Sequence, residues 1–261
     1  MGLLIGLCTA PVAAQQMAPQ PSFDPNQAER RFETEQSRIA RPGVDVPRLA
    51  RPAEPQVDTK PIFVLRQVVV SGASIIPPNR LAAAYQPYIG KNVSQADLAA
   101  IATAISDSYR AAGFHLTRAI VPPQDIEGGR VRIQVIEGGI TELVLKGDGA
   151  EQFGVRALLN PVISEQPSRL ATLDRQLMLI NARPGVRITD TALEEIGTAS
   201  GRFRLVLFLQ TWHLYASINV DNLGSPAVGP WQTYKTAAFN SYLIPGASLW
   251  VNLSTTPGDV R

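Results

Sequence analysis

Ile62-Phe-Val-Leu-Arg-Gln-Val-Val-Val-Ser-Gly72 is the stretch from which the fold can be worked out. Its apolar, β-branched residues predict a strand over 62–70, and Ser71-Gly72 ends it. A short helix is expected at 79–85. A longer helix should begin at Ser94, a residue type that caps helix N-termini, and stop before Gly113.

Two more strands complete this unit, at 116–121 before Pro122-Pro123 and at 131–136 after the turn Glu127-Gly128-Gly129. The order is therefore strand, helix, helix, strand, strand. Leu98, Ile101, Ile105 and Tyr109 recur at three- and four-residue spacing, so the long helix should pack one apolar face on the sheet.

The same order recurs further along the chain. A strand over 140–146 ends at Gly147, a short helix over 153–159 precedes Pro161, and Ser168 is expected to cap a second helix. Strands are expected over 186–193 and 203–209. Gly147 follows Gly72 by 75 residues, and the same offset relates Leu98 to Leu173 and Ile105 to Ile180. We interpret the chain as two tandem copies of one module, at 62–138 and 139–211.

Composition excludes several classes of site. The 261 residues carry 24 basic and 22 acidic side chains, a net charge of +2 that creates no strong field for nucleic acid. Cys8 is the only cysteine, which excludes a disulfide scaffold and a cysteine zinc site. His115 and His213 have no ligand-like neighbours, and Glu194-Glu195, which lacks a partner base, is interpreted as a solvated turn. We predict no enzyme, no catalytic residue, no metal, no cofactor and no small-molecule substrate.

The N-terminal 61 residues differ from the modules. Residues 1–14 combine a short apolar core with Val12-Ala13-Ala14 and predict a signal peptide. Residues 15–61 are rich in proline and predict a linker with one polar helix, which begins at Asp24-Pro25.

Residues 212–261 hold all three tryptophans and only four charged residues. From Trp212 to Asp221, apolar residues alternate with polar ones, and 247–254 alternates as well. This is the pattern of outer-membrane barrel strands, but a soluble antiparallel sheet with one wet face shows it too. Lys235 falls on the same face as Trp231 and Phe239.

Four motifs carry a family resemblance: Phe63 to Gly72; Gly113 to Pro123 with Gly129 to Gly138; Leu179 to Ile188; and Ser217 to Ser225. Together they resemble the outer-membrane transporters of two-partner secretion, the hemolysin secretion/activation proteins of the ShlB/FhaC/HecB type. The resemblance implies an α+β fold with two tandem POTRA domains (strand-helix-helix-strand-strand), followed by the first antiparallel strands of an outer-membrane β-barrel that begins at 212–261. The family's barrel has about 16 strands and needs more than about 200 residues, so the chain is expected to be only the front part of such a protein.

The resemblance also implies a function and a place. The POTRA domains would face the periplasm of a Gram-negative cell and capture an unfolded secreted partner of the hemolysin or adhesin type, without nucleic acid. Capture would use β-augmentation, in which an extended chain adds to an exposed strand edge. The edge residues expected to bind are Leu116, Thr117, Arg118, Ala119, Ile120, Val121, Arg187 and Ile188.

Two alternatives stay open. These strands could be ordinary protected edges, with Arg118, Arg187 and Asp190 preventing pairing. The whole chain could also be a soluble periplasmic interaction module made of tandem POTRA-like domains.

Overall fold

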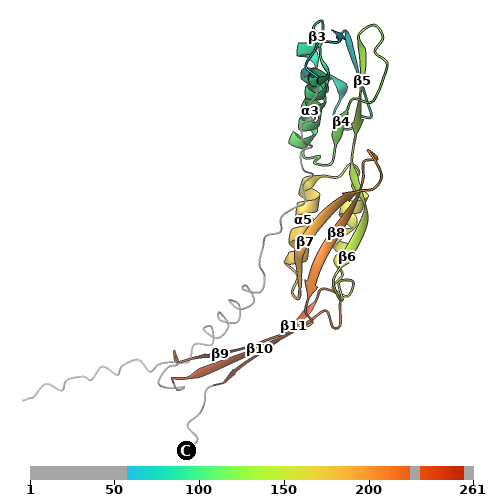
Figure 1. Ribbon diagram of the computed structural model, residues 1–261. Coiled ribbons are helices and arrows are strands. Elements are labelled where there is room, and N and C mark those ends of the chain that lie inside the picture. The colour runs from blue at the N-terminus through green and yellow to red at the C-terminus, as the bar shows by residue number, and fades with distance from the viewer. Residues whose placement is uncertain (1–57, 224–229, 256–261) are drawn as a thin grey trace, which may run out of the picture.

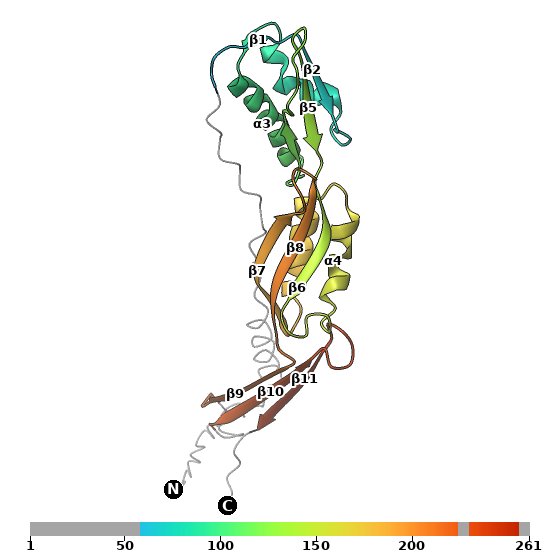
Figure 2. The same cartoon turned by 45° about the vertical axis from the view of Figure 1, so that its right-hand side comes forward.

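The computed structural model describes residues 58–223 and 230–255. They form three bodies in a row: a first module (62–138), a second module (139–211) and a terminal sheet (214–255), as Figures 1 and 2 show from two sides. The predicted signal peptide, and the polar helix and most of the linker at 15–61, lie outside the described residues.

The first module has the predicted element order. Its sheet runs β2-β5-β4, with β2 parallel and β4 antiparallel to β5, and α3 packs on one face. Tyr109, Ile101 and Ile105 of α3 are fully buried in its core. The elements are β1 (Phe63–Val64), β2 (Gln67–Ser71), α2 (Pro78–Leu81), η1 (Ala82–Ala84), η2 (Gln86–Tyr88), β3 (Asn92–Val93), α3 (Gln95–Ala111), β4 (Arg118–Ile120) and β5 (Arg130–Ile136).

Two local predictions for this module have different outcomes. Ser94 caps α3 as expected: its side chain accepts the Asp97 N–H at 3.2 Å while Asp97 accepts the Ser94 N–H at 2.8 Å, a capping box. The single strand expected over 62–70 is wrong, because it splits into β1 and β2. The chain changes partner there: Leu65 N–H donates to Lys91 O (2.9 Å), and Arg66 N–H donates to Gly129 O (2.8 Å).

The second module repeats the architecture. Its sheet runs β6-β8-β7, with β6 parallel and β7 antiparallel to β8, and its two helices lie together on one side (Figure 2). Phe153, Leu173 and Phe203 lie at the centre of its core. The elements are β6 (Gly139–Lys146), α4 (Val155–Ser164), α5 (Leu170–Asn181), β7 (Val186–Glu195) and β8 (Arg202–Thr211).

Both helix boundaries predicted for the second module are wrong. Pro161 lies inside α4 rather than after it; in the last turn a proline removes little, and Glu165 N–H still closes on Pro161 O at 3.2 Å. Ser168 does not cap α5, whose N-cap is Arg169 without a side-chain cap. Ser168 is buried instead, and its N–H donates to Gly138 O at 3.0 Å.

The glycines that end the first strand of each module explain the 75-residue repeat. Gly72 and Gly147 both have positive φ, +79° and +138°. A Cβ on Gly72 would lie 2.3 Å from Val135 O, and one on Gly147 would lie 2.1 Å from Leu209 O. In both modules the first strand therefore passes so close to the central strand that only glycine fits.

The terminal sheet consists of β9 (Leu214–Asp221), β10 (Gln232–Asn240) and β11 (Ser248–Thr255), antiparallel with β10 in the centre. Its two faces differ as the alternation predicted. Leu214, Ile218, Val220, Leu249 and Leu253 are 55–70% exposed on one face. The side chains of Tyr234, Thr236 and Ala238 are buried on the other.

Candidate functional site

The first predicted edge, on β4, lies where the sequence placed it but is shorter. β4 borders the sheet and spans only Arg118–Ile120. Leu116 and Thr117 precede it with 1% and 2% of their surface exposed, and Leu116 packs in the core of the second module. Their side chains are therefore not accessible to a partner. Arg118, Ala119, Ile120 and Val121 are partly exposed and remain candidates.

The outward main chain of β4 is partly occupied. Arg118 and Ile120 pair with β5, so Ala119 points away from the sheet, and its N–H donates to Ser106 Oγ of α3 at 2.8 Å. The Thr117 N–H donates to Phe114 O at 3.3 Å. An incoming chain would have to replace the Ser106 hydroxyl to reach the Ala119 N–H.

The second predicted edge, on β7, shows the same device. β7 borders its sheet, with Arg187 exposed and Ile188 6% exposed. The Ile188 N–H donates to Asn181 Oδ1 of α5 at 2.8 Å. Asn181 follows Ser106 by 75 residues, so the same helix position supplies a polar cap to the edge strand in both modules.

Arg118 takes part in the joint between the modules. It donates to both carboxylate oxygens of Glu195 at 3.0 and 2.6 Å, across the boundary between the modules. Bidentate arginine–carboxylate pairs are geometrically specific, so this pair helps to fix the two modules relative to each other. The expectation that Glu194-Glu195 forms a solvated turn is wrong, because both residues lie at the end of β7 and each pairs with an arginine.

Glu137 ties the end of β5 to the loop after β2. It accepts the N–H groups of Ser74 (2.7 Å) and Ile75 (3.0 Å), the Tyr109 hydroxyl (2.7 Å) and the Ser74 hydroxyl. Burial acts to raise the Glu137 pKa, but these hydrogen bonds together hold it below its ordinary value. Burial and the neighbouring carboxylate raise the pKa of Tyr109. This cluster is a structural tie, since its donors are consumed within the module.

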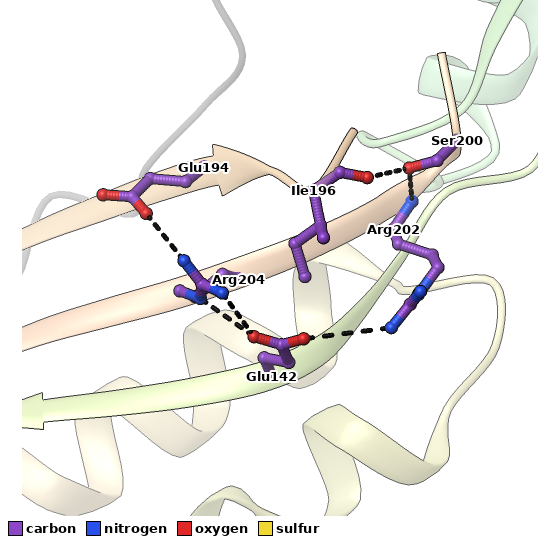
Figure 3. A network of polar contacts seen from close by, with 6 residues as sticks. All are labelled: Glu142, Glu194, Ile196, Ser200, Arg202 and Arg204. Carbon is purple, nitrogen blue, oxygen red and sulfur yellow. Dashed lines mark hydrogen bonds and ion pairs between the residues drawn. The ribbon is translucent and has the colours of Figure 1, made fainter. Parts of the chain in front are cut away.

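The sheet face opposite the helices carries arginines in both modules. In the second module they are neutralised, as Figure 3 shows: Arg204 Nε and Nη2 donate to Glu142 at 2.9 and 2.7 Å, and Glu194 lies 3.6 Å from Arg204. Arg202 lies 3.8 Å from the same Glu142. The hydrogen bonds from Glu142 hold the pKa of Arg204 above its ordinary value.

The corresponding face of the first module contains a groove of about 1040 Å³, lined by Arg66, Gln67, Val69, Gln124, Asp125, Glu127, Gly128, Arg130 and Arg132. Sequence reasoning missed this site. The signal was present, because Arg-x-Arg opens the central strand of both modules, as Arg130-Val-Arg132 and Arg202-Phe-Arg204.

Neither histidine is placed for catalysis. His213 Nδ1 lies 3.0 Å from Asn240 O, and its ring stacks on Phe153 with 4.9 Å between centroids. His115 is buried. Within residues 58–223 and 230–255, no group of three or more His, Cys, Asp or Glu side chains could hold a metal ion. None of the helices in these ranges is long and apolar enough to cross a membrane.

The family of the first module follows from its match to a family model. Residues 63–138 match the model described as "POTRA domain, ShlB-type". The first module is a ShlB-type POTRA domain. The second module has the same POTRA-like order of elements and is followed by strands, so the predicted fold class is confirmed.

Curated relatives agree with the predicted family. The chain is 31% identical over 183 residues to the heme/hemopexin transporter protein HuxB of Haemophilus influenzae, covering 67% of this chain and 31% of HuxB. It is 25% identical over 186 residues to the outer membrane transporter CdiB of Escherichia coli, covering 70% of this chain and 31% of CdiB. The chain thus spans less than a third of the length of these relatives.

Solved structures add evidence on the fold. CdiB from Escherichia coli matches 87% of this chain and 42% of its own with a TM-score of 0.59 at 22% identity. CdiB from Acinetobacter baumannii matches with a TM-score of 0.50 at 16% identity, over 87% of this chain and 45% of its own. The resemblance to two-partner secretion transporters is confirmed, as is the predicted location at the outer membrane with periplasmic POTRA domains. The relatives are transport proteins, in agreement with the expectation of no enzyme.

Proposed function

We propose that this chain is part of an outer-membrane transporter that captures an unfolded, hemolysin- or adhesin-like secreted protein in the periplasm and passes it through a β-barrel. Residues 62–138 and 139–211 would be the capturing POTRA pair, and 212–261 the start of the barrel. The observation that carries the proposal is the direct continuation of the second module into an amphipathic antiparallel sheet (Figure 1).

The terminal sheet has the chemistry of barrel strands. Ile218 is 70% exposed, Val220 60% and Leu253 57%, all on one face of strands eight or nine residues long. Lipid-facing residues of a barrel alternate with inward-facing polar ones in this way. On the inward face, Tyr215 and Trp250 on β9 and β11 approach to 6.4 Å between ring centroids, flanking Ala238 of β10.

Lys235 departs from the apolar pattern. It lies level with Ile218 and Leu253 on the exposed face. A lysine can be accommodated there if its ammonium extends along the surface toward polar groups, as long cationic side chains do at membrane boundaries.

Capture by strand addition is supported by the position of β4 and β7 at sheet edges. Each edge has one outward N–H held by a single side-chain oxygen, on Ser106 or Asn181. One neutral hydrogen bond contributes only about 1 kcal/mol, so an incoming main chain can replace the cap while the same cap discourages accidental pairing.

The test of capture uses the full chain and a permanently unfolded protein, reduced and carboxymethylated α-lactalbumin, as the probe. Ser106→Ala frees the Ala119 N–H and should strengthen binding several-fold, whereas Ala119→Pro removes this outward donor and should weaken it by a similar factor. Circular dichroism checks that both variants fold. Equal binding by both variants would refute capture at β4.

Cell fractionation tests the alternative, a soluble periplasmic interaction module. The proposed function predicts that the chain sediments with the outer membrane, because the apolar face of the terminal sheet must be covered by lipid. Recovery in the soluble periplasmic fraction would favour the alternative.

A further inference from the structure

The two modules carry the same arginine pair in different surroundings. Arg132 in β5 and Arg204 in β8 occupy equivalent positions, and each lies beside the first strand of its module. The residue level with Arg204 is Glu142, which accepts two hydrogen bonds from it. The residue level with Arg132 is Val69, which offers no charge. The first module therefore lacks the carboxylate that completes this site in the second.

The groove around Arg132 is open and cationic on its floor. Arg130 donates to Gln67 Oε1 at 3.0 Å, and within the described residues Arg66, Arg130 and Arg132 make no ion pair with a carboxylate. The two acidic residues of the lining, Asp125 and Glu127, belong to the loop between β4 and β5 rather than to the sheet. A carboxylate arriving over the sheet would meet guanidinium groups first.

Gln124 closes the β4 side of this groove to main-chain pairing. Pro122-Pro123 ends β4, and proline has no N–H to continue a ladder with β5. The Gln124 side chain takes that place: its Nε2 donates to Arg132 O and its Oε1 accepts the Arg132 N–H, both at 2.8 Å. An extended chain is thereby directed to the opposite edge of the sheet.

That opposite edge is β2. The Gln67 N–H donates to Gly129 O at 3.2 Å, which fixes the alternation of the parallel ladder with β5. Gln67, Val69 and Ser71 direct their main-chain groups to β5, so Val68 and Val70 direct theirs away from the sheet. These N–H and C=O groups are placed to pair with one more strand.

We propose that the groove of the first module binds an extended acidic segment of the secreted partner, which adds to the outer edge of β2 and places carboxylates over Arg130 and Arg132. This inference rests on the proposed function and adds to it a second docking edge with a preference for sequence. Side chains of a strand alternate between faces, so carboxylates should stand at every second position. They would complete in the first module the arrangement that Glu142 provides in the second.

The experiment measures binding of fluorescent nine-residue peptides to the full chain by anisotropy at low and high salt. A peptide of alternating Glu and Thr should bind, and its binding should weaken with salt because screening reduces ionic contacts. Peptides with Gln or Lys in place of Glu should bind at least about tenfold more weakly, the loss expected when charge-assisted hydrogen bonds are removed.

The decisive variant is Val69→Glu, which supplies the first module with its own carboxylate beside Arg132. It should abolish binding of the acidic peptide, whereas the matched control Val69→Gln, of the same size without the charge, should retain it. N-methylation of the peptide at alternate residues should abolish binding in one register only, because only every second N–H of an added strand faces β2. Equal binding by Val69→Glu and the original chain would overturn the proposal.

The same set of proteins separates the two proposals. If the acidic peptide fails to bind while unfolded α-lactalbumin still responds to Ser106→Ala and Ala119→Pro, the arginine groove is refuted and capture at β4 stands. If α-lactalbumin does not respond to these substitutions but the peptide binding is sensitive to Val69→Glu, the acidic groove stands alone.

Discussion

The first and second modules share a frame but differ in the chemistry of their open sheet faces. Both place an arginine pair at the start of the central strand, yet Glu142 and Glu194 neutralise the pair only in the second. The ends of their sheets differ too. Glu137 ties the first module to the loop after β2, whereas in the second the Thr211 hydroxyl donates to Asp148 O. The comparison indicates that the frame constrains the glycines and the core, while surface charge is free to specialise each copy.

The largest expected effect comes from breaking the shared frame. Gly72→Ala and Gly147→Ala should each lower the free energy of unfolding by more than about 2 kcal/mol, because the new Cβ strains a positive φ and overlaps a carbonyl oxygen of the neighbouring strand. Urea unfolding followed by circular dichroism measures the loss.

Gly90→Ala is the matched control for this prediction. Gly90 also has a positive φ, +81°, but nothing lies within 4 Å of its Cβ position. It should lose only the conformational part, about 1 kcal/mol. If the three substitutions cost the same, close strand approach is not the reason for the glycines.

The frame was largely predictable from sequence because it depends on periodic, local signals. The apolar spacing from Leu98 to Tyr109 and the repeat of Gly72 at Gly147 each follow from one rule about buried faces or tight approaches. Boundaries were less predictable where a distant partner decides them. Leu65 turns toward Lys91, and Ser168 is held by Gly138, and neither contact has a sequence signal.

A smaller effect, on pH dependence, should distinguish the two modules. The Glu137 pKa lies below its ordinary value of 4.5 in the folded chain, so the carboxylate stabilises the fold above that pH, and this contribution is lost as pH falls through the folded pKa. Its hydrogen bonds correspond to about 1–2 kcal/mol. The tie in the second module is neutral, so acid should loosen the first module before the second.

Glu137→Gln tests this by hydrogen exchange followed at pH 7 and at pH 3. At pH 7 the variant should exchange faster in β2 and β5 than the original chain, and at pH 3 the two should become alike. Identical acid sensitivity of the two proteins in these strands would show that other groups govern the response.

The predicted binding edges were only partly foreseeable. The repeat placed β4 and β7 at sheet edges, but whether an edge is available depends on side chains that reach it from elsewhere. Ser106 and Asn181 lie more than one turn inside helices that sequence reasoning treated only as apolar faces. The arginine groove was missed because its meaning depends on a neighbour in another strand, Val69 in one module and Glu142 in the other.

The smallest effect on stability, and the sharpest test of the comparison, is to give the second module the surroundings of the first. Glu142→Val removes a half-exposed ion pair and should change the free energy of unfolding by no more than about 1 kcal/mol. It should, however, leave Arg202 and Arg204 with a face like that of Arg130 and Arg132. In a Val69→Glu background, where the first groove is closed, Glu142→Val should restore weak, salt-sensitive binding of the acidic peptide, and Glu142→Gln should restore less, because the glutamine still occupies the arginine. Glu194 stays 3.6 Å from Arg204 and competes for it, so adding Glu194→Gln should strengthen the restored binding. If none of these variants binds the peptide, the arginine pair alone is not sufficient, and the β2 edge or the loop at 124–128 must contribute what the second module lacks.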